Sequence, residues 1–469
     1  MTTTKRDTPL DEAAVAELKA HFRGALLRPG DAGYDAARSI WNGMIDKRPS
    51  LIARCTGPAD VAAAVNFARA HHPLLAVRGG GHNVAGNALC DGGLVIDLSP
   101  MRSVQVDPQA RIAHVQPGVT LGELDHQTQV FGLASPVGMV SQTGVAGLTL
   151  GGGFGWLSRK YGLACDNLLS ADVVTADGRF VTASEREHTD LFWGMRGGGG
   201  NFGVVTSFAF QLHPVGPTVM AGVVFYPMEQ AREVLHFYRD CAAAAPDELT
   251  MAAVLRMAPP APFLPQYIHG QPVIGIAACH SGSIEEGERV MRPLKNFGTP
   301  VANMIEPMPF VRLQSMLDTS SPSGHHYYVK SEYLPGLSDA AIETITSYAT
   351  HLSSPLTSVL IAQLRGAISR VDEHATAAGN RRARFVLNIQ SSWLEPGESP
   401  RHIQWTREFW TAIRPFSTGG VYVNLLSQDE GEERVRAAYG ANYGRLVALK
   451  SKYDPTNLFR VNQNIKPVG

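Results

Sequence analysis

The sequence is poor in cysteine and in net charge, and each shortage argues against a class of protein. Five cysteines in 469 residues are scattered and show no Cys-x-x-Cys spacing, so we expect no zinc site and a reducing compartment. The 41 basic and 42 acidic side chains leave a formal net charge of -1, which gives no electrostatic reason to expect nucleic acid or an anionic membrane as the partner. A small-molecule partner is the simpler expectation.

The chain also lacks an apolar leader and an uninterrupted apolar run. Residues 1–7 are polar and no apolar stretch follows them, so we expect no secretory signal and a cytoplasmic protein. The longest uncharged segment, residues 127–158, is not expected to cross a membrane, because glycines recur in it and Ser141, Gln142 and Thr143 interrupt it. A chain of this length predicts two or three folding units.

The order of expected elements indicates an α+β fold. Residues 60–210 alternate short helices, short strands and glycine-rich loops, with a hairpin signal at Asp177-Gly178 between two apolar runs. Residues 213–217, with two prolines and a glycine, are typical of a boundary. Beyond them, strands alternate with amphipathic helices, which predicts a large, mostly antiparallel sheet covered by helices on one face.

Three glycine-rich loops, at residues 78–86, 144–155 and 197–203, stand out in the first half of the chain. The last contains a Gly-x-Gly-x-x-Gly pattern, but a strand rather than a helix follows it, so a nicotinamide-dinucleotide site is improbable. Each loop alone is equally well explained as a tight turn that needs positive φ. Together they favour an extended anionic cofactor that lies along backbone amides.

His82 and Cys165 are the reactive side chains of two such stretches. His82 ends the run Gly79-Gly80-Gly81, and Cys165 follows Tyr161-Gly162-Leu163-Ala164. An imidazole at the end of a glycine run can lie against a planar cofactor, and a thiol is the other side chain that can bond to a flavin ring. Taken singly, each is as well explained as a loop histidine or a buried thiol.

These motifs resemble the berberine bridge enzyme-like oxidases, a family of FAD proteins of the vanillyl-alcohol-oxidase type. The resemblance rests on residues 78–83, 141–153, 159–167, 196–203, 452–459 and 462–465. It implies a two-domain FAD-linked oxidase fold, with the first part of an FAD-binding domain at 1–213, a substrate-binding domain at 214–425, and a C-terminal segment, 426–469, that returns to the first domain.

The resemblance also implies how the cofactor is held. His82 is expected to bond to the 8α-methyl carbon of the flavin and Cys165 to carbon 6, so that FAD is doubly tethered. Thr143, which is not a bulky aliphatic, falls where relatives control access of oxygen, and this favours an oxidase over a dehydrogenase. Further FAD contacts are expected from Arg78, Gly79, Gly80, Gly81, Asn83, Gly144, Val145, Gly147, Leu148, Gly152, Gly155, Val205, Asn462 and Asn464.

One departure from the family concerns the catalytic base. Many relatives carry Tyr-x-Asn-Tyr near this point, whereas this chain reads Tyr422-Val423-Asn424-Leu425, and leucine cannot take a proton. Strand alternation predicts that Tyr422 faces away from residue 425. Tyr328 and Gln363 are the remaining candidates for catalysis, although Gln363 can only orient a substrate and both are equally explained by sheet packing.

Three functions stay open. The first is oxidation of a small organic substrate (a sugar, an alcohol or a secondary metabolite), with hydride passing to flavin N5 and the electrons to O2, which gives hydrogen peroxide. The second is oxidative cyclisation or amine oxidation of an alkaloid-like or polyketide-like metabolite, where a strong base is less necessary. The third is a flavin-binding sequestration protein without catalysis.

Overall fold

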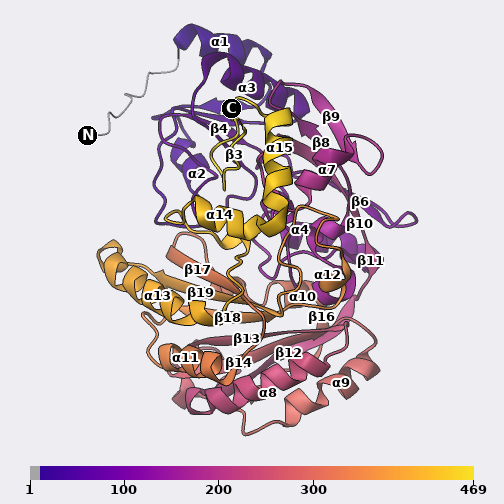
Figure 1. The fold of residues 1–469 in the computed structure, drawn as a ribbon, viewed down its shortest axis with the longest axis vertical. Helices are drawn as coiled ribbons and strands as arrows, with labels where there is room; N and C mark the ends of the chain where they lie inside the picture. The colour runs from indigo at the N-terminus through magenta and orange to yellow at the C-terminus, as the bar shows by residue number, and fades with distance from the viewer. Residues whose placement is uncertain (1–10, 469) are drawn as a thin grey trace.

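The computed structural model describes residues 11–468, which form two domains that meet along one face of a large sheet (Figure 1). The first domain contains two sheets: a four-stranded one ordered β1-β2-β4-β3, and a five-stranded antiparallel one ordered β5-β6-β10-β8-β9. Its elements are α1 (Glu12–His21), β1 (Ala25–Leu27), α2 (Tyr34–Arg38), β2 (Leu51–Arg54), α3 (Pro58–His71), β3 (Leu75–Arg78), β4 (Leu94–Asp97), β5 (Val104–Asp107), β6 (Ile112–Val115), α4 (Leu121–Thr128), β7 (Leu133–Ala134), α5 (Val145–Leu150), α6 (Ser158–Tyr161), β8 (Leu168–Val174), β9 (Phe180–Ser184), α7 (Thr189–Met195), β10 (Val204–Gln211) and β11 (His213–Pro214).

Strand β4 is the centre of the four-stranded sheet and runs parallel to both β2 and β3. Its residues Leu94, Val95 and Ile96 are fully buried, as expected for a parallel strand covered on both faces. Strand β3 leads directly into the first glycine loop. The sheet therefore delivers Gly79 to His82 to one edge of the domain.

The second domain is built on one eight-stranded sheet, ordered β15-β12-β14-β13-β18-β19-β17, with β16 also paired to β12. All of its pairs are antiparallel. Its elements are β12 (Thr218–Pro227), α8 (Ala231–Ala244), β13 (Leu249–Met257), β14 (Pro272–His280), α9 (Ile284–Asn296), β15 (Ala302–Asn303), β16 (Glu306–Pro309), α10 (Phe310–Gln314), β17 (His326–Leu334), α11 (Asp339–Ala349), β18 (Ser358–Gln363), α12 (Ala367–Arg370), β19 (Phe385–Trp393) and α13 (Ser399–Ile413).

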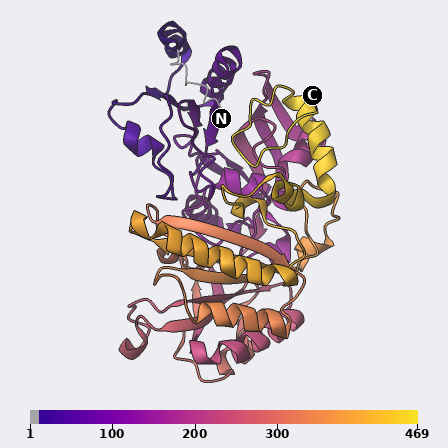
Figure 2. The same ribbon diagram turned by 60° about the vertical axis from the view of Figure 1, so that its left-hand side comes forward.

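Helices α8, α9, α11 and α13 cover one face of this sheet, and Figure 2 shows α13 lying across it. One hydrophobic core joins these helices to alternate strand residues such as Leu255, Ile361 and Leu387. The strand residues between them point to the opposite face, toward the first domain. The α+β fold with a large antiparallel sheet under helices is confirmed.

The chain returns to the first domain after the sheet. Helices α14 (Glu432–Tyr439) and α15 (Tyr443–Tyr453) lie beside the first domain (Figure 1), and Tyr439, Leu446 and Ile465 share a core with residues of β8 and β10. Within residues 11–468 no helix is long and apolar enough to cross a membrane.

Candidate FAD and substrate site

A cavity of about 340 Å³ lies between the two domains. The glycine loops supply one wall, through residues such as Gly80, Gly144 and Gly200, and the sheet supplies another through β18 and β19. Asn462 and its neighbours, from the end of the chain, complete the lining. Segments far apart in the sequence therefore meet around one space.

Glycine is required where the first two loops touch. A Cβ on Gly80 would lie 2.5 Å from the Cα of Gly144, and a Cβ on Gly144 would lie 2.7 Å from the Cα of Gly80. Such contacts are closer than side chains tolerate, so the two loops can pack only as bare backbone. Gly147 and Gly200 also line the cavity, and a Cβ on either would meet nothing within 4 Å. These positions leave room for a ligand against the main chain.

His82 is the reactive side chain that the structure brings to the cavity. Its ring stacks on Trp41 at a centroid distance of 4.4 Å and an interplanar angle of 16°, and Trp41 stacks in turn on Tyr327 at 3.8 Å. The Nε2 atom is buried and has no hydrogen-bond partner among the described residues. Burial lowers the pKa of His82 to about 4, so the imidazole is neutral and able to form a bond near neutral pH.

Cys165 does not line the cavity, which corrects the expectation of a second tether at this residue. The short 3-10 helix Ala164–Asn167 carries its side chain into the interior, where the sulfur lies 3.7 Å from Asp166 Oδ1. Burial, with the neighbouring Asp166 carboxylate, raises the pKa of the Cys165 thiol well above its usual range. Asp166 is itself held by Arg381 at 2.6 Å. Burial keeps the Cys165 thiol protonated and enclosed.

The other expected FAD contacts divide into two groups. Those that line the cavity are Gly79, Gly80, Gly81, Asn83, Gly144, Gly147, Leu148, Val205 and Asn462. Those that do not are Arg78, Val145, Gly152, Gly155 and Asn464. Val145 is fully buried in the core, and Gly155 packs so tightly that a Cβ would lie 2.0 Å from the Val137 carbonyl oxygen. Thr143 also lines the cavity.

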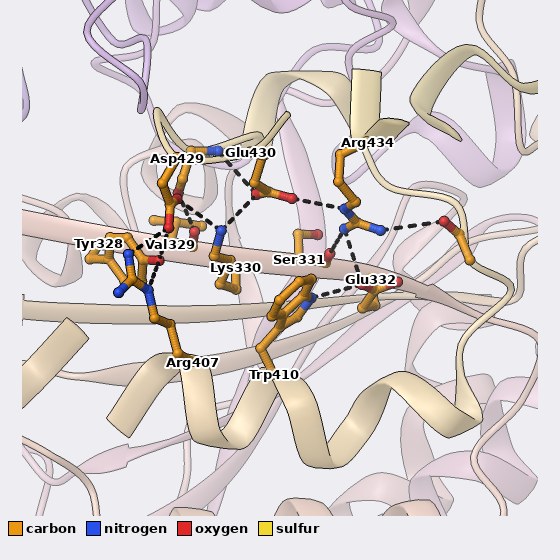
Figure 3. A network of polar contacts seen from close by, with 12 residues as sticks. Tyr328, Val329, Lys330, Ser331, Glu332, Arg407, Trp410, Asp429, Glu430 and Arg434 are labelled. Carbon is orange, nitrogen blue, oxygen red and sulfur yellow. Dashed lines mark hydrogen bonds and ion pairs between the residues drawn. The ribbon is translucent and has the colours of Figure 1, made fainter. Parts of the chain in front are cut away.

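Tyr328 and Gln363, the two candidates for catalysis, lie outside the cavity. Tyr328 points to the helix-covered face of β17, where its hydroxyl donates to Asp429 at 2.7 Å and accepts from Arg407 Nε at 2.9 Å (Figure 3). Its neighbour Tyr327 takes the cavity side and packs on Trp41, as strand alternation requires. The amide of Gln363 donates to the Ala242 carbonyl oxygen at 2.9 Å. Neither side chain reaches a substrate in this space.

Tyr328 belongs to a buried ionic network that anchors the segment beside the cavity (Figure 3). Lys330 pairs with Asp429 at 2.9 Å and Glu430 at 3.3 Å. Arg434 pairs with Glu430 at 2.8 Å and with Glu332 at 3.0 Å. The network ties residues 429–434 to β17. Residues 422–425, which line the cavity, precede that segment in the chain.

Asn388 and Gln390 of β19 are cavity residues that the sequence analysis missed. They are two positions apart and so share the face of the sheet opposite Leu387 and Ile389, which are fully buried under the helices. The Oδ1 atom of Asn388 is buried and has no hydrogen-bond partner among the described residues. Polar residues at alternate positions of an otherwise apolar strand were the signal that pointed to them.

Tyr422 and Leu425 both line the cavity, whereas strand alternation predicted opposite faces. Residues Val423–Leu425 form a 3-10 turn rather than a strand, so the period of two does not apply. The Tyr422 hydroxyl oxygen accepts hydrogen bonds from Gly153 N at 3.0 Å and from Asn424 Nδ2 at 2.8 Å. Burial raises the pKa of Tyr422 to about 12.

Lys450 of α15 holds the glycine loop and the end of the chain together. Its ammonium donates to the carbonyl oxygens of Asn201 at 2.8 Å and Phe459 at 2.9 Å and to Asp454 Oδ2 at 2.6 Å. The Lys450 and Asp454 side chains are fully buried. Since Asn201 and Phe459 line the cavity, this ion pair shapes its wall.

Comparison with known proteins gives this arrangement a family. Residues 49–184 match the FAD binding domain family, and residues 421–466 match the family described as berberine and berberine like. An FAD-linked oxidoreductase of Dictyostelium discoideum is 32% identical over 459 residues, which cover 97% of this chain and 97% of the relative. The chain belongs to the berberine bridge enzyme-like family of FAD-linked oxidoreductases. It is therefore an FAD-dependent oxidoreductase.

Other members of this family resemble the chain over nearly all its length. The (R)-6-hydroxynicotine oxidase of Paenarthrobacter nicotinovorans is 31% identical over 457 residues, covering 96% of this chain and 98% of the relative. The crystal structure of 6-hydroxy-D-nicotine oxidase from Arthrobacter nicotinovorans superposes with a TM-score of 0.86 at 29% identity, covering 95% of this chain and 98% of that one.

The residues present fit FAD. Bare glycine backbone lines the cavity, and buried polar atoms without partners, among them His82 Nε2 and Asn462 Oδ1, belong to residues on its wall. None of the lining side chains is an aspartate, glutamate, lysine or arginine. Within residues 11–468 no group of three His, Cys, Asp or Glu side chains is placed to hold a metal ion.

Proposed function

We propose that this protein is an FAD-dependent oxidase of a small organic substrate whose reacting part is uncharged, with the flavin attached covalently through His82. The observation that carries the proposal is the neutral, stacked imidazole of His82 at the wall of a cavity lined by glycine backbone. Bound FAD supplies an acceptor for hydride from a substrate carbon and passes the electrons to O2, which is reduced to hydrogen peroxide.

The side chains that line the cavity have three further roles: they orient His82, bind the substrate and exclude water. Trp41 stacks on His82 and holds the plane of its imidazole. Asn388 and Gln390 present amide groups that can donate to and accept from a substrate. Met139, Phe154, Leu360 and Leu425 form the apolar part of the lining and exclude water from the reacting atoms.

Proton chemistry in this cavity favours one type of substrate. Among residues 11–468, the titratable side chains that line it are His82, Tyr422 and Tyr439. With a pKa of about 12, Tyr422 is protonated at neutral pH. A protonated phenol can donate a hydrogen bond but cannot remove a proton. Among oxidase substrates, a carbon beside an amine nitrogen is therefore better suited than an alcohol, because hydride can leave without removal of a hydroxyl proton.

This observation supports a second candidate function, amine oxidation or oxidative ring closure of an alkaloid-like metabolite. One relative carries the name (R)-6-hydroxynicotine oxidase. A panel of matched secondary amines and alcohols separates the two candidates: each compound is mixed with the holoprotein without oxygen, and bleaching of the flavin is recorded. Bleaching by amines alone supports the second function, and bleaching by alcohols the first.

Acid precipitation tests the attachment. Wild-type protein is expected to carry its yellow colour into the acid pellet, and the His82→Ala variant is expected to release it into the supernatant. Cys165→Ala should behave as wild type, because its thiol does not reach the cavity. Release of all flavin from the wild-type protein would refute the covalent bond, and release from Cys165→Ala would show that the thiol is the tether.

Oxygen as the electron acceptor and the compartment are parts of the same proposal. Thr143, a small side chain on the cavity wall, supports access of O2, and peroxide formed in step with substrate tests it. The five cysteines are all free thiols, which supports a reducing compartment such as the cytoplasm. Fractionation of cells that produce the protein tests this location.

A further inference from the structure

Arg256 lies on the cavity side of the large sheet, in line with a residue that lines the cavity. In β13 it pairs directly with Ser358 of β18, and Ser358 pairs with Gln390 of β19. Residues directly opposite one another in an antiparallel sheet point to the same face. Gln390 lines the cavity, so the Arg256 side chain leaves the sheet on that face. Two strand spacings place the Cα atoms of Arg256 and Gln390 about 10 Å apart.

The guanidinium of Arg256 lacks an ionic partner. Its Nε donates to the Met257 carbonyl oxygen at 3.2 Å and its Nη1 donates to Ser320 Oγ. No carboxylate within residues 11–468 pairs with it, and burial lowers the pKa of this group with nothing to offset the loss of water. A partly buried cation that is left uncompensated gains strongly from an incoming anion.

Three other buried cations of the structure, Lys450, Arg381 and Arg159, are satisfied in ways that Arg256 is not. Lys450 and Arg381 each pair with an aspartate. Arg159, which also has no ion pair, donates to four backbone carbonyl oxygens. Arg256 donates only to one carbonyl and one hydroxyl, so most of its N–H groups are available to a ligand.

The contact with Ser320 links Arg256 to the part of the cavity wall that contains Ser321 and Trp41. Ser320 ends the 3-10 helix Asp318–Ser320, and the next residue, Ser321, lines the cavity. The Ser321 carbonyl oxygen accepts from Trp41 Nε1 at 2.9 Å, and Trp41 stacks on His82. The path from the guanidinium to the reacting region therefore runs along Ser320, Ser321 and Trp41.

We propose that Arg256, together with Ser320, to which it donates a hydrogen bond, forms a subsite for a carboxylate at one end of the substrate. The inference rests on the proposed function, since it assigns the substrate class of that same cavity. The body of the substrate lies against the uncharged wall, and its carboxylate extends past the lining residue Ser321 to the guanidinium of Arg256, which lies beyond that wall. The planar fork of arginine matches a carboxylate with two parallel hydrogen bonds.

The test uses the flavin-loaded protein and three phenylalkanoates, namely benzoate, 3-phenylpropanoate and 5-phenylpentanoate, each compared with its primary amide. Binding is read from the change in flavin absorbance on titration. For at least one length we expect the wild-type protein to bind the carboxylate about tenfold more tightly than the amide, as for a hydrogen-bonded charge pair worth 1.4 kcal/mol or more.

Three variants sharpen the result. Arg256→Gln should bring carboxylate and amide within about twofold of each other, and Arg256→Lys should keep an intermediate preference, because a point charge remains but the fork is lost. Arg312→Gln is the matched control: its side chain is 62% exposed and pairs with Glu306 at 3.4 Å, so the wild-type preference should persist.

Two outcomes overturn the proposal: equal binding of carboxylate and amide by the wild type at every length, or a preference that survives in Arg256→Gln. If Arg256→Gln does not fold, Arg256→Lys decides the matter: an undiminished preference for the carboxylate over the amide in that variant would show that the planar guanidinium does not bind the carboxylate. Flavin content is measured in every sample. Protein without flavin contradicts the proposed function itself, whereas flavin-loaded protein without a carboxylate preference contradicts only the subsite.

Discussion

Replacing Lys450 by methionine is expected to destabilise the protein far more than the same replacement at Lys452. Both lysines lie on α15 and pair with an aspartate. The Lys450 and Asp454 side chains are fully buried, whereas the Lys452 side chain is 61% exposed and its partner Asp190 is 38% exposed. The comparison holds the helix and the chemistry constant and changes the burial.

The magnitude follows from what Lys450→Met leaves behind. Asp454 would keep the hydrogen bonds it accepts from the backbone N–H groups of Leu458 and Phe459, at 2.7 and 2.9 Å, but would lose its only cationic partner. Removing one member of a buried pair costs about 3–5 kcal/mol. The exposed pair at Lys452 is worth about 0–1 kcal/mol. We therefore expect the two variants to differ by roughly 3 kcal/mol.

The free energy of unfolding from urea titrations, followed by tryptophan fluorescence at equal flavin content, measures both variants. A third variant, Lys450→Met with Asp454→Leu, removes both charges and should be less destabilised than Lys450→Met alone, because no unpaired charge remains. Lys450→Met should also retain less flavin in a His82→Ala background, since Asn201 and Phe459 lose the ammonium that holds them.

Equal stability of Lys450→Met and Lys452→Met would refute this reasoning. So would a double variant that is less stable than Lys450→Met, since the cost could then not come from an uncompensated Asp454. If Lys450→Met retained as much flavin as its parent in the His82→Ala background, the Lys450 ion pair would stabilise α15 without shaping the cavity wall.

Three further variants test other parts of the structure. Tyr422→Phe removes the oxygen that accepts hydrogen bonds from the Gly153 and Asn424 N–H groups and should lower the free energy of unfolding by about 1–3 kcal/mol. It should also slow reduction of the flavin by substrate, as measured by stopped-flow absorbance. An unchanged rate would contradict a role for Tyr422 in the cavity. Tyr328→Phe should leave that rate within about twofold, because its hydroxyl lies on the far face of the sheet, and a large loss of rate would place it in the site after all. Asp125 is buried and its carboxyl has no hydrogen-bond partner among the described residues, and burial raises its pKa well above the usual range. The unfolded chain ionises this group near pH 4, while the native carboxyl stays protonated to higher pH, so the contribution of Asp125 to stability falls as the pH rises above 4. Asp125→Asn should therefore gain melting temperature over wild type above pH 4, and that gain must be absent below pH 4.

The sequence predicted the parts of the site that depend on backbone alone. Gly80 and Gly144 were recognisable because only glycine permits two loops to touch, and His82 because it ends such a loop. The sheet and its helices were predictable from the spacing of apolar residues along the sequence. Alternate strand residues such as Leu387 and Ile389 must be apolar because they pack under helices. These features need no knowledge of distant contacts.

The direction of individual side chains was predicted less well, because it depends on local backbone geometry that the periodicity of apolar residues does not reveal. A 3-10 helix turns Cys165 inward and a 3-10 turn places Tyr422 beside Leu425, where a motif and a strand pattern had predicted otherwise. Gln390 was not recognised as a cavity residue, because strand register across the sheet is invisible in one sequence. The partners of Tyr328, Asp429 and Arg407, lie 101 and 79 positions further along the chain, too far for local reasoning to find.

The return of the chain to its first domain has a consequence for the order of assembly in the cell. The cavity wall includes residues 79–84 near the start of the sequence and, near its end, Phe459 and residues 461–463. A ribosome makes the first of these long before the last, and it covers the newest few dozen residues in its exit tunnel. The pocket therefore closes only after residues 461–463 have left the tunnel, and flavin must be loaded into it after that point.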